Sequence, residues 1–92
     1  MKIRIAGTEV EYSAFGEGLE ALSDPPTRQE ETALAALFAA ITAQGLTPQK
    51  VESYRSLGMA QRGRFLLRST DPAGHPKEHY GRLVKGKALL EG

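Results

Sequence analysis

Residues 27–46, TRQEETALAALFAAITAQGL, form the longest amphipathic segment of the chain and decide its fold. Thr27 and Glu30 have the spacing of a capping box, in which the Thr27 side chain accepts a hydrogen bond from the third helical amide and the Glu30 side chain accepts one from the amide of Thr27. The apolar residues that follow lie one helical turn apart, at Leu34, Leu37, Phe38 and Ile41. Gly45 suits the left-handed residue that ends a helix, and Leu46 suits the apolar contact beyond it. We therefore predict a helix over residues 28–44 that forms most of the core.

The segment before this helix predicts a β-hairpin. Apolar residues alternate with charged ones, with the apolar set being Ile3, Ile5, Val10 and Tyr12. Gly7-Thr8 fits a two-residue turn with glycine first. This turn would pair Ile5 with Val10 and Ile3 with Tyr12.

The segment after the helix is ambiguous. Thr47 suits a helix N-cap and Pro48 the first helical position, where a missing amide costs nothing. Val51, Tyr54 and Leu57 then give a short amphipathic helix. The alternative is that residues 51–57 pair as a strand.

A second hairpin is predicted around Asp71-Pro72-Ala73-Gly74, where proline suits a type I turn and Gly74 a bulge with positive φ. This register puts Arg64 opposite Arg82 and Phe65 opposite Gly81. One face then carries Phe65, Leu67 and Leu83. The other face carries Arg62, Arg64, Leu66, Arg68, Tyr80 and Arg82.

These elements predict one α+β domain over residues 1–92 in the order ββ-α-α-ββ, because the long helix offers the main apolar stripe on which the hairpins can pack. The two hairpins would form an antiparallel sheet with that helix on one face. The expected core is Ile3, Ile5, Val10, Tyr12, Leu34, Leu37, Phe38, Ile41, Phe65 and Leu67. Leu89 and Leu90, near the end of the chain, should pack onto it.

Composition excludes several kinds of chemistry. The chain has no cysteine, so disulfides, thiol nucleophiles and Cys-ligated metals are excluded. Its first residues lack the apolar core of a signal peptide, and no apolar run is long enough to span a bilayer. We expect a cytoplasmic protein without a membrane partner and predict no cofactor.

The two halves of the chain carry opposite charge. Residues 1–47 have three basic and seven acidic side chains, a net charge of −4, whereas residues 48–92 have nine basic and four acidic ones, a net charge of +5. The total of +1 hides this separation. A basic half of this kind is typical of proteins that bind an anionic partner, nucleic acid first among them.

The candidate binding residues are therefore the basic and aromatic ones of the second hairpin: Arg62, Arg64, Arg68, Tyr80, Arg82 and Lys85. Arginines at alternate strand positions can contact successive phosphates while a tyrosine ring stacks on a base. Arg64 opposite Arg82 destabilises a hairpin unless a partner neutralises the pair. If acidic groups of the first half lie among these arginines in the folded chain, the nucleic-acid hypothesis loses support.

Binding to a protein partner is as well supported by the sequence as binding to nucleic acid, whereas a ribonuclease activity and a metal site are less well supported. A protein–protein regulator, adaptor or inhibitor, of the kind that phages and mobile elements encode, would dock by charge complementarity on an acidic surface or as a homodimer. Catalysis has no clear nucleophile or carboxylate pair, and the least improbable activity is a ribonuclease using His79, Tyr80 and Arg82. His75 and His79 have metal-ligand spacing for a helix, but a turn and a strand direct them apart, so no metal site is predicted.

Overall fold

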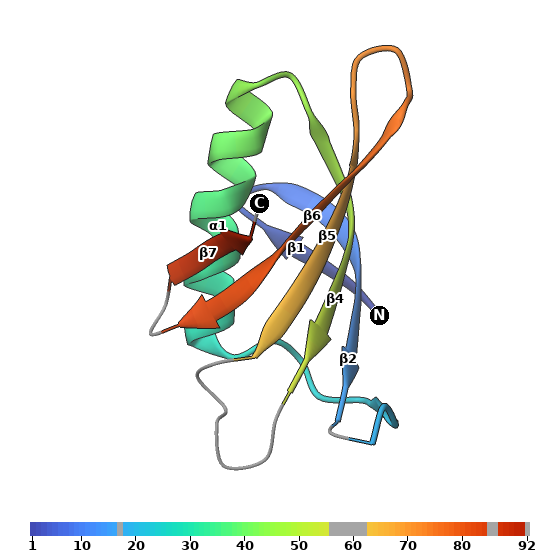
Figure 1. Cartoon of the computed structure of the whole chain (residues 1–92), viewed down its shortest axis with the longest axis vertical. Helices are drawn as coiled ribbons and strands as arrows, with labels where there is room; N and C mark the ends of the chain where they lie inside the picture. The colour runs from blue at the N-terminus through green and yellow to red at the C-terminus, as the bar shows by residue number, and fades with distance from the viewer. Residues whose placement is uncertain (17, 56–62, 85–86, 92) are drawn as a thin grey trace.

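The computed structural model describes residues 1–16, 18–55, 63–84 and 87–91. Within these ranges the chain forms one helix and seven strands (Figure 1). The strands are β1 (Lys2–Ile5), β2 (Thr8–Phe15), β3 (Ala21–Leu22), β4 (Thr47–Tyr54), β5 (Arg64–Thr70), β6 (Pro76–Val84) and β7 (Lys87–Glu91). The helix is α1 (Arg28–Ala43).

The strands form one open sheet in the order β1-β2-β4-β5-β6-β7, with β3 paired to the end of β2. Neighbouring strands are antiparallel except β2 and β4, which are parallel because α1 crosses between them. The helix lies on one face and contacts β1, β4 and β7 (Figure 1). We call this the inner face and the opposite one the outer face. The α+β class is as predicted, but the order with two helices is wrong.

Helix α1 begins and ends as predicted. The Thr27 hydroxyl accepts from the Glu30 amide at 3.1 Å, and the Glu30 carboxylate accepts from the Thr27 amide at 3.5 Å. Gly45 has φ 86°, and the amides of Gly45 and Leu46 donate to the carbonyls of Thr42 and Ile41, which is the Schellman pattern. No helix in the described part of the chain is long and apolar enough to cross a membrane.

The first hairpin forms, but its predicted register is wrong. The turn consists of Ala6 and Gly7, whose φ values of 52° and 79° match a type I′ turn rather than one at Gly7-Thr8. Ile3 consequently pairs with Val10 instead of Tyr12. The error is two residues, so every side chain stays on its predicted face and the apolar face survives.

The predicted helix at residues 47–57 is also wrong, because residues 47–54 form strand β4. The alternative of a strand over residues 51–57 is confirmed for residues 51–54, and residues 56–57 lie outside the described ranges. β4 is central, with β2 and β5 on either side, and it buries Val51 and Ser53 on the inner face. Pro48 sits near the start of the strand, beside a bulge before Lys50, where a missing amide is tolerated. Pairing along both edges overrides the local helix signal.

The second hairpin has the predicted register. Arg64 pairs with Arg82 and Phe65 with Gly81, and Gly74 has the positive φ that the bulged turn requires. A methyl group at Gly81 would overlap the Leu89 carbonyl oxygen and lie 2.9 Å from the Phe65 ring. The glycine is therefore needed where the ring and β7 approach the strand.

The core between α1 and the inner face contains the predicted residues. Nine of the ten are buried and Ile3 is partly buried against them. The core also takes in Ala14, Ala33, Val51 and Leu83. The expectation for the C-terminal leucines is wrong: Leu89 and Leu90 lie in β7 with about half of their surface exposed, and Ala88 packs on the core instead.

Candidate functional site

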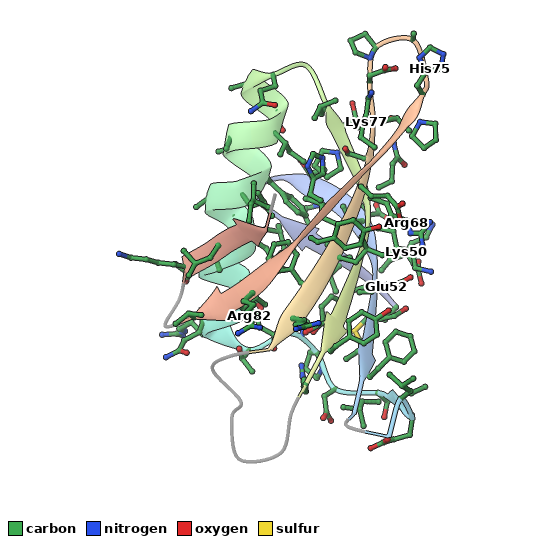
Figure 2. All side chains as sticks on the ribbon, viewed as in Figure 1. Lys50, Glu52, Arg68, His75, Lys77 and Arg82 are labelled. Atoms are coloured by element: carbon green, nitrogen blue, oxygen red, sulfur yellow. The ribbon has the colours of Figure 1, made fainter. Side chains whose placement is uncertain are left out.

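The strand register arranges the outer face in cross-strand rows. One row, which we call the charged row, comprises Glu11, Lys50, Arg68 and Glu78. The next comprises Ser13, Glu52, Leu66 and Tyr80. The third, which we call the aromatic–arginine row, comprises Phe15, Tyr54, Arg64 and Arg82. Figure 2 shows Lys50, Glu52 and Arg68 extending from the side of the sheet away from α1.

The structure brings four of the six predicted binding residues onto this face. Arg64 and Arg68 project from β5, and Tyr80 and Arg82 from β6, and all four are exposed. The other two, Arg62 and Lys85, lie outside the described residues. The sequence did not indicate that Phe15, Lys50, Glu52 and Tyr54 would join them, because their placement depends on the order of the strands.

The charged row is largely neutralised by its own members and their neighbours. Arg68 pairs with Glu78 at 3.6 Å, and Lys50 pairs with Glu52 at 3.5 Å. The Tyr54 hydroxyl donates to Glu52 at 2.6 Å, and this bond, aided by the charges of Lys50 and Arg68, lowers the pKa of the Glu52 carboxyl. Glu52 therefore stays ionised and holds the cations around it.

The aromatic–arginine row has a different character. The rings of Phe15 and Tyr54 stack with centroids 5.3 Å apart and planes 19° from parallel. Arg64 and Arg82 lie directly opposite each other on the next two strands. This end of the outer face thus combines two stacked aromatic rings with two arginines at paired strand positions.

Acidic groups of the first half of the chain mostly pair elsewhere. Glu9 lies near Lys2 and Arg4 on β1, and Glu11 pairs with the N-terminal amine at 3.0 Å. Two acidic groups that lie near Arg68, Glu52 and Glu78, come from the second half. In the charged row, Glu11 of the first half lies in line with Lys50 and Arg68.

A buried polar network lies on the inner face, and sequence reasoning missed it. The carboxylate of Glu30, 7% exposed, accepts from the Tyr12 hydroxyl at 2.8 Å, from Ser53 at 3.1 Å and from Arg55 at 3.2 Å. Arg55 also pairs with Asp24 at 3.3 Å. The network ties α1 to β2 and β4, and every carboxylate oxygen of Glu30 is engaged.

This network gives Tyr12 an unusual titration. Burial, reinforced by the hydrogen bond to Glu30 and its negative charge, raises the pKa of Tyr12 from the ordinary 10 to about 12. The folded state keeps the phenol protonated where the unfolded state loses the proton.

We expect an alkaline loss of stability from this residue. The free energy of unfolding should not depend on Tyr12 below about pH 10, and should then fall by about 1.4 kcal/mol per pH unit until about pH 12. Urea unfolding of wild type and Tyr12→Phe at about pH 9 and about pH 11.5 measures the difference. The variant should be less stable than wild type at the lower pH, but its free energy of unfolding should fall less between the two pH values. Equal falls in wild type and variant would contradict the raised pKa of Tyr12.

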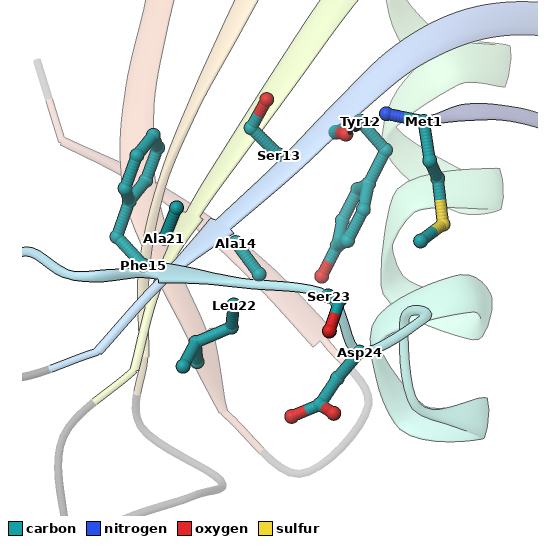
Figure 3. A pocket seen from close by; sticks show the side chains of 9 residues that line it. All are labelled: Met1, Tyr12, Ser13, Ala14, Phe15, Ala21, Leu22, Ser23 and Asp24. Carbon is teal, nitrogen blue, oxygen red and sulfur yellow. Dashed lines mark hydrogen bonds between the residues drawn. The ribbon is translucent and has the colours of Figure 1, made fainter.

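A shallow pocket adjoins the network (Figure 3). Its volume is about 270 Å³, and Met1, Tyr12, Leu22 and Asp24 are among the residues that line it. Ligand pockets usually start near 300 Å³ and present several unengaged polar groups. Here the Tyr12 hydroxyl and the Asp24 carboxylate are already bonded to Glu30 and Arg55.

The histidines are separated as expected. His75 lies 3.2 Å from Asp71 in the turn, where the His75 amide lowers the pKa of the aspartate, and His79 bonds Ser69 at 2.9 Å on the inner face. The described residues hold no cluster of three potential metal ligands. His79 also lies on the face opposite Tyr80 and Arg82, so the three candidate ribonuclease residues are not brought together.

Comparison with known proteins gives no relative: no family model, curated protein or solved structure matches the chain.

Proposed function

We propose that this chain is a small non-enzymatic binding module that holds single-stranded nucleic acid on its outer face. The observation that carries the proposal is the aromatic–arginine row, which sets two stacked rings beside two opposed arginines. Surfaces that bind single strands combine aromatic rings, on which bases stack, with basic groups that contact the backbone. Neighbouring strands are about 4.8 Å apart, so the row from β2 to β6 extends about 14 Å.

The features of α1 favour a single strand over a duplex. Proteins that read duplex DNA commonly insert a helix or a β-ribbon into the major groove. The one basic residue of α1 is Arg28, its first turn also contains the exposed Glu31, and its last turn has no basic residue, so this helix offers phosphates little attraction. The outer face of the sheet, which lies opposite α1, is the better platform (Figure 1).

A protein partner is the second candidate, and the charged row favours it. The alternation of Glu11, Lys50, Arg68 and Glu78 presents both signs, as expected of a surface that docks a protein by charge complementarity. A regulator, adaptor or inhibitor would use this row, whereas nucleic acid would use the aromatic–arginine row. Substitutions in the two rows therefore separate the candidates.

The test is the double substitution Arg64→Gln/Arg82→Gln. It should weaken binding to mixed-sequence single-stranded RNA or DNA and reduce the slope of log K against log salt by about 2, near 0.7–0.9 for each phosphate contact. Fluorescence anisotropy over a salt series gives both quantities. The free energy of unfolding should change by less than about 1 kcal/mol, since both residues are exposed.

A matched control is Arg4→Gln/Arg28→Gln, which removes the same charge from β1 and from the start of α1. The control should keep most of the binding. Equal losses in the two variants would mean that net charge alone acts, and a wild-type chain that binds no RNA or DNA at low salt would refute the proposal. Loss of binding to a protein partner on Arg68→Gln would favour the second candidate.

A further inference from the structure

Tyr80 is an aromatic side chain of the outer face that lies outside the aromatic–arginine row. It stands on β6, two residues before Arg82, and 52% of its surface is exposed. Its hydroxyl donates to Glu78 at 3.3 Å, which directs the ring along β6. The cross-strand partner of Tyr80 is Leu66, so an apolar side chain adjoins the ring on the same face. Tyr80 therefore offers a second surface on which a base can stack.

The two aromatic positions are too far apart for neighbouring stacked bases. Tyr54 lies on β4 and Tyr80 on β6, with β5 between them, and their rows are two residues apart along the strands. The strand spacing and the rise per residue place these two residues about 12 Å apart. Stacked bases of one strand are only about 3.4 Å apart. A strand that places one base at each position must therefore unstack them.

The arginines lie along the path between the two aromatic positions. Arg64 is the cross-strand partner of Tyr54. Arg82 is in turn the partner of Arg64 and follows Tyr80 by two residues on the same face of β6. A strand that runs from one aromatic position to the other therefore passes both arginines with its phosphates, which is the arrangement that holds a single strand by base and backbone together.

We propose that the outer face binds pyrimidine-rich single strands and holds two of their bases apart. One base stacks on the Phe15–Tyr54 pair and the other on Tyr80, and the phosphates between them contact the arginines. Unstacking bases costs free energy. Purines have the larger rings and stack on one another more strongly than pyrimidines, so a purine strand loses more when it is opened. This inference rests on the proposed function and adds the class of strand that the site prefers.

The test compares two single-stranded DNA probes of equal length, oligo(dT) and oligo(dA), by fluorescence anisotropy with the full chain. Wild type should bind oligo(dT) about tenfold more tightly than oligo(dA). The slopes of log K against log salt should agree for the two probes, because both present the same phosphates to the arginines. A preference with equal slopes assigns the difference to the bases.

A substitution at Tyr80 tests the second base position. Tyr80→Ala should weaken binding to oligo(dT) by about 5- to 150-fold, the range for the loss of one base–aromatic stack. The variant should also bind the two probes about equally, because a strand held at one base position does not have to unstack. Tyr80→Phe is the matched control: it keeps the ring and removes only the hydroxyl that bonds Glu78, so it should keep the affinity and the preference.

The outcomes separate this inference from the proposed function. Equal affinity of wild type for the two probes would overturn the inference, and so would a Tyr80→Ala chain that binds like wild type or keeps the preference. In each of these cases the chain still binds nucleic acid and the proposed function stands. Absence of binding to both probes at low salt would overturn both and favour the protein partner. The comparison of probes with wild type decides the preference even if Tyr80→Ala does not fold.

Discussion

Replacing Phe38 by alanine is expected to lower the free energy of unfolding by about 3–5 kcal/mol. Phe38 is 1% exposed and lies on the side of α1 that packs on the inner face of the sheet. Truncating its ring removes apolar burial and leaves a cavity that the surrounding strands cannot fully close. A domain of this size has a total stability of about 5–15 kcal/mol, so the variant should be close to unfolding at room temperature.

Urea and thermal unfolding followed by circular dichroism measure this effect. The control is Leu19→Ala, which truncates a side chain that is 70% exposed and should change stability by less than about 0.5 kcal/mol. A Phe38→Ala chain that melts with wild type would show that α1 does not pack against the sheet as described.

The features that the sequence predicted well are those fixed by neighbouring residues. The capping box at Thr27, the Schellman close at Gly45 and the turn at Gly74 each depend on a few consecutive side chains and one backbone conformation. The turn fixes the register of the second hairpin, and this register places Arg64 opposite Arg82.

The features that the sequence did not predict depend on distant pairing. Strand β4 begins with Thr47-Pro48, a valid helix start, and becomes a strand only because β2 and β5 pair along its two edges. The partnership of Phe15 with Tyr54 on the outer face follows from that parallel pairing, and no local pattern encodes it. Local sequence patterns therefore could not predict half of the candidate site, the residues that β2 and β4 contribute.

The buried network did leave a signal in the sequence. Glu30 precedes Leu34 by four residues and Leu37 by seven, so it lies on the apolar stripe of α1, although the capping box alone explained its identity. The alternation of residues in the first hairpin places Tyr12 on its apolar face. A carboxylate and a phenol on two faces that must pack together predict a hydrogen bond between them.

The second large effect is expected from Glu30→Ala, which should lower the free energy of unfolding by about 3–5 kcal/mol. The substitution leaves the buried hydroxyls of Tyr12 and Ser53 without their acceptor and removes one of the two carboxylates that pair with Arg55. A buried donor that loses its acceptor has neither water nor protein as a hydrogen-bond partner, and this unsatisfied group destabilises the folded state. The capping bond to Thr27 is lost as well.

Glu31→Ala is the matched control, because Glu31 is the adjacent carboxylate in the same helical turn but is exposed. Its removal should cost only the helix-dipole contribution, about 0.3–1 kcal/mol. In a double-mutant cycle, Glu30→Ala and Tyr12→Phe should couple by about 0.5–3 kcal/mol. The reason is that Tyr12→Phe removes the hydroxyl that Glu30→Ala would otherwise leave without an acceptor. If Glu30→Ala and Glu31→Ala cost the same, the Glu30 carboxylate is not buried in a network, and the attachment of α1 to β2 and β4 would depend on apolar packing alone.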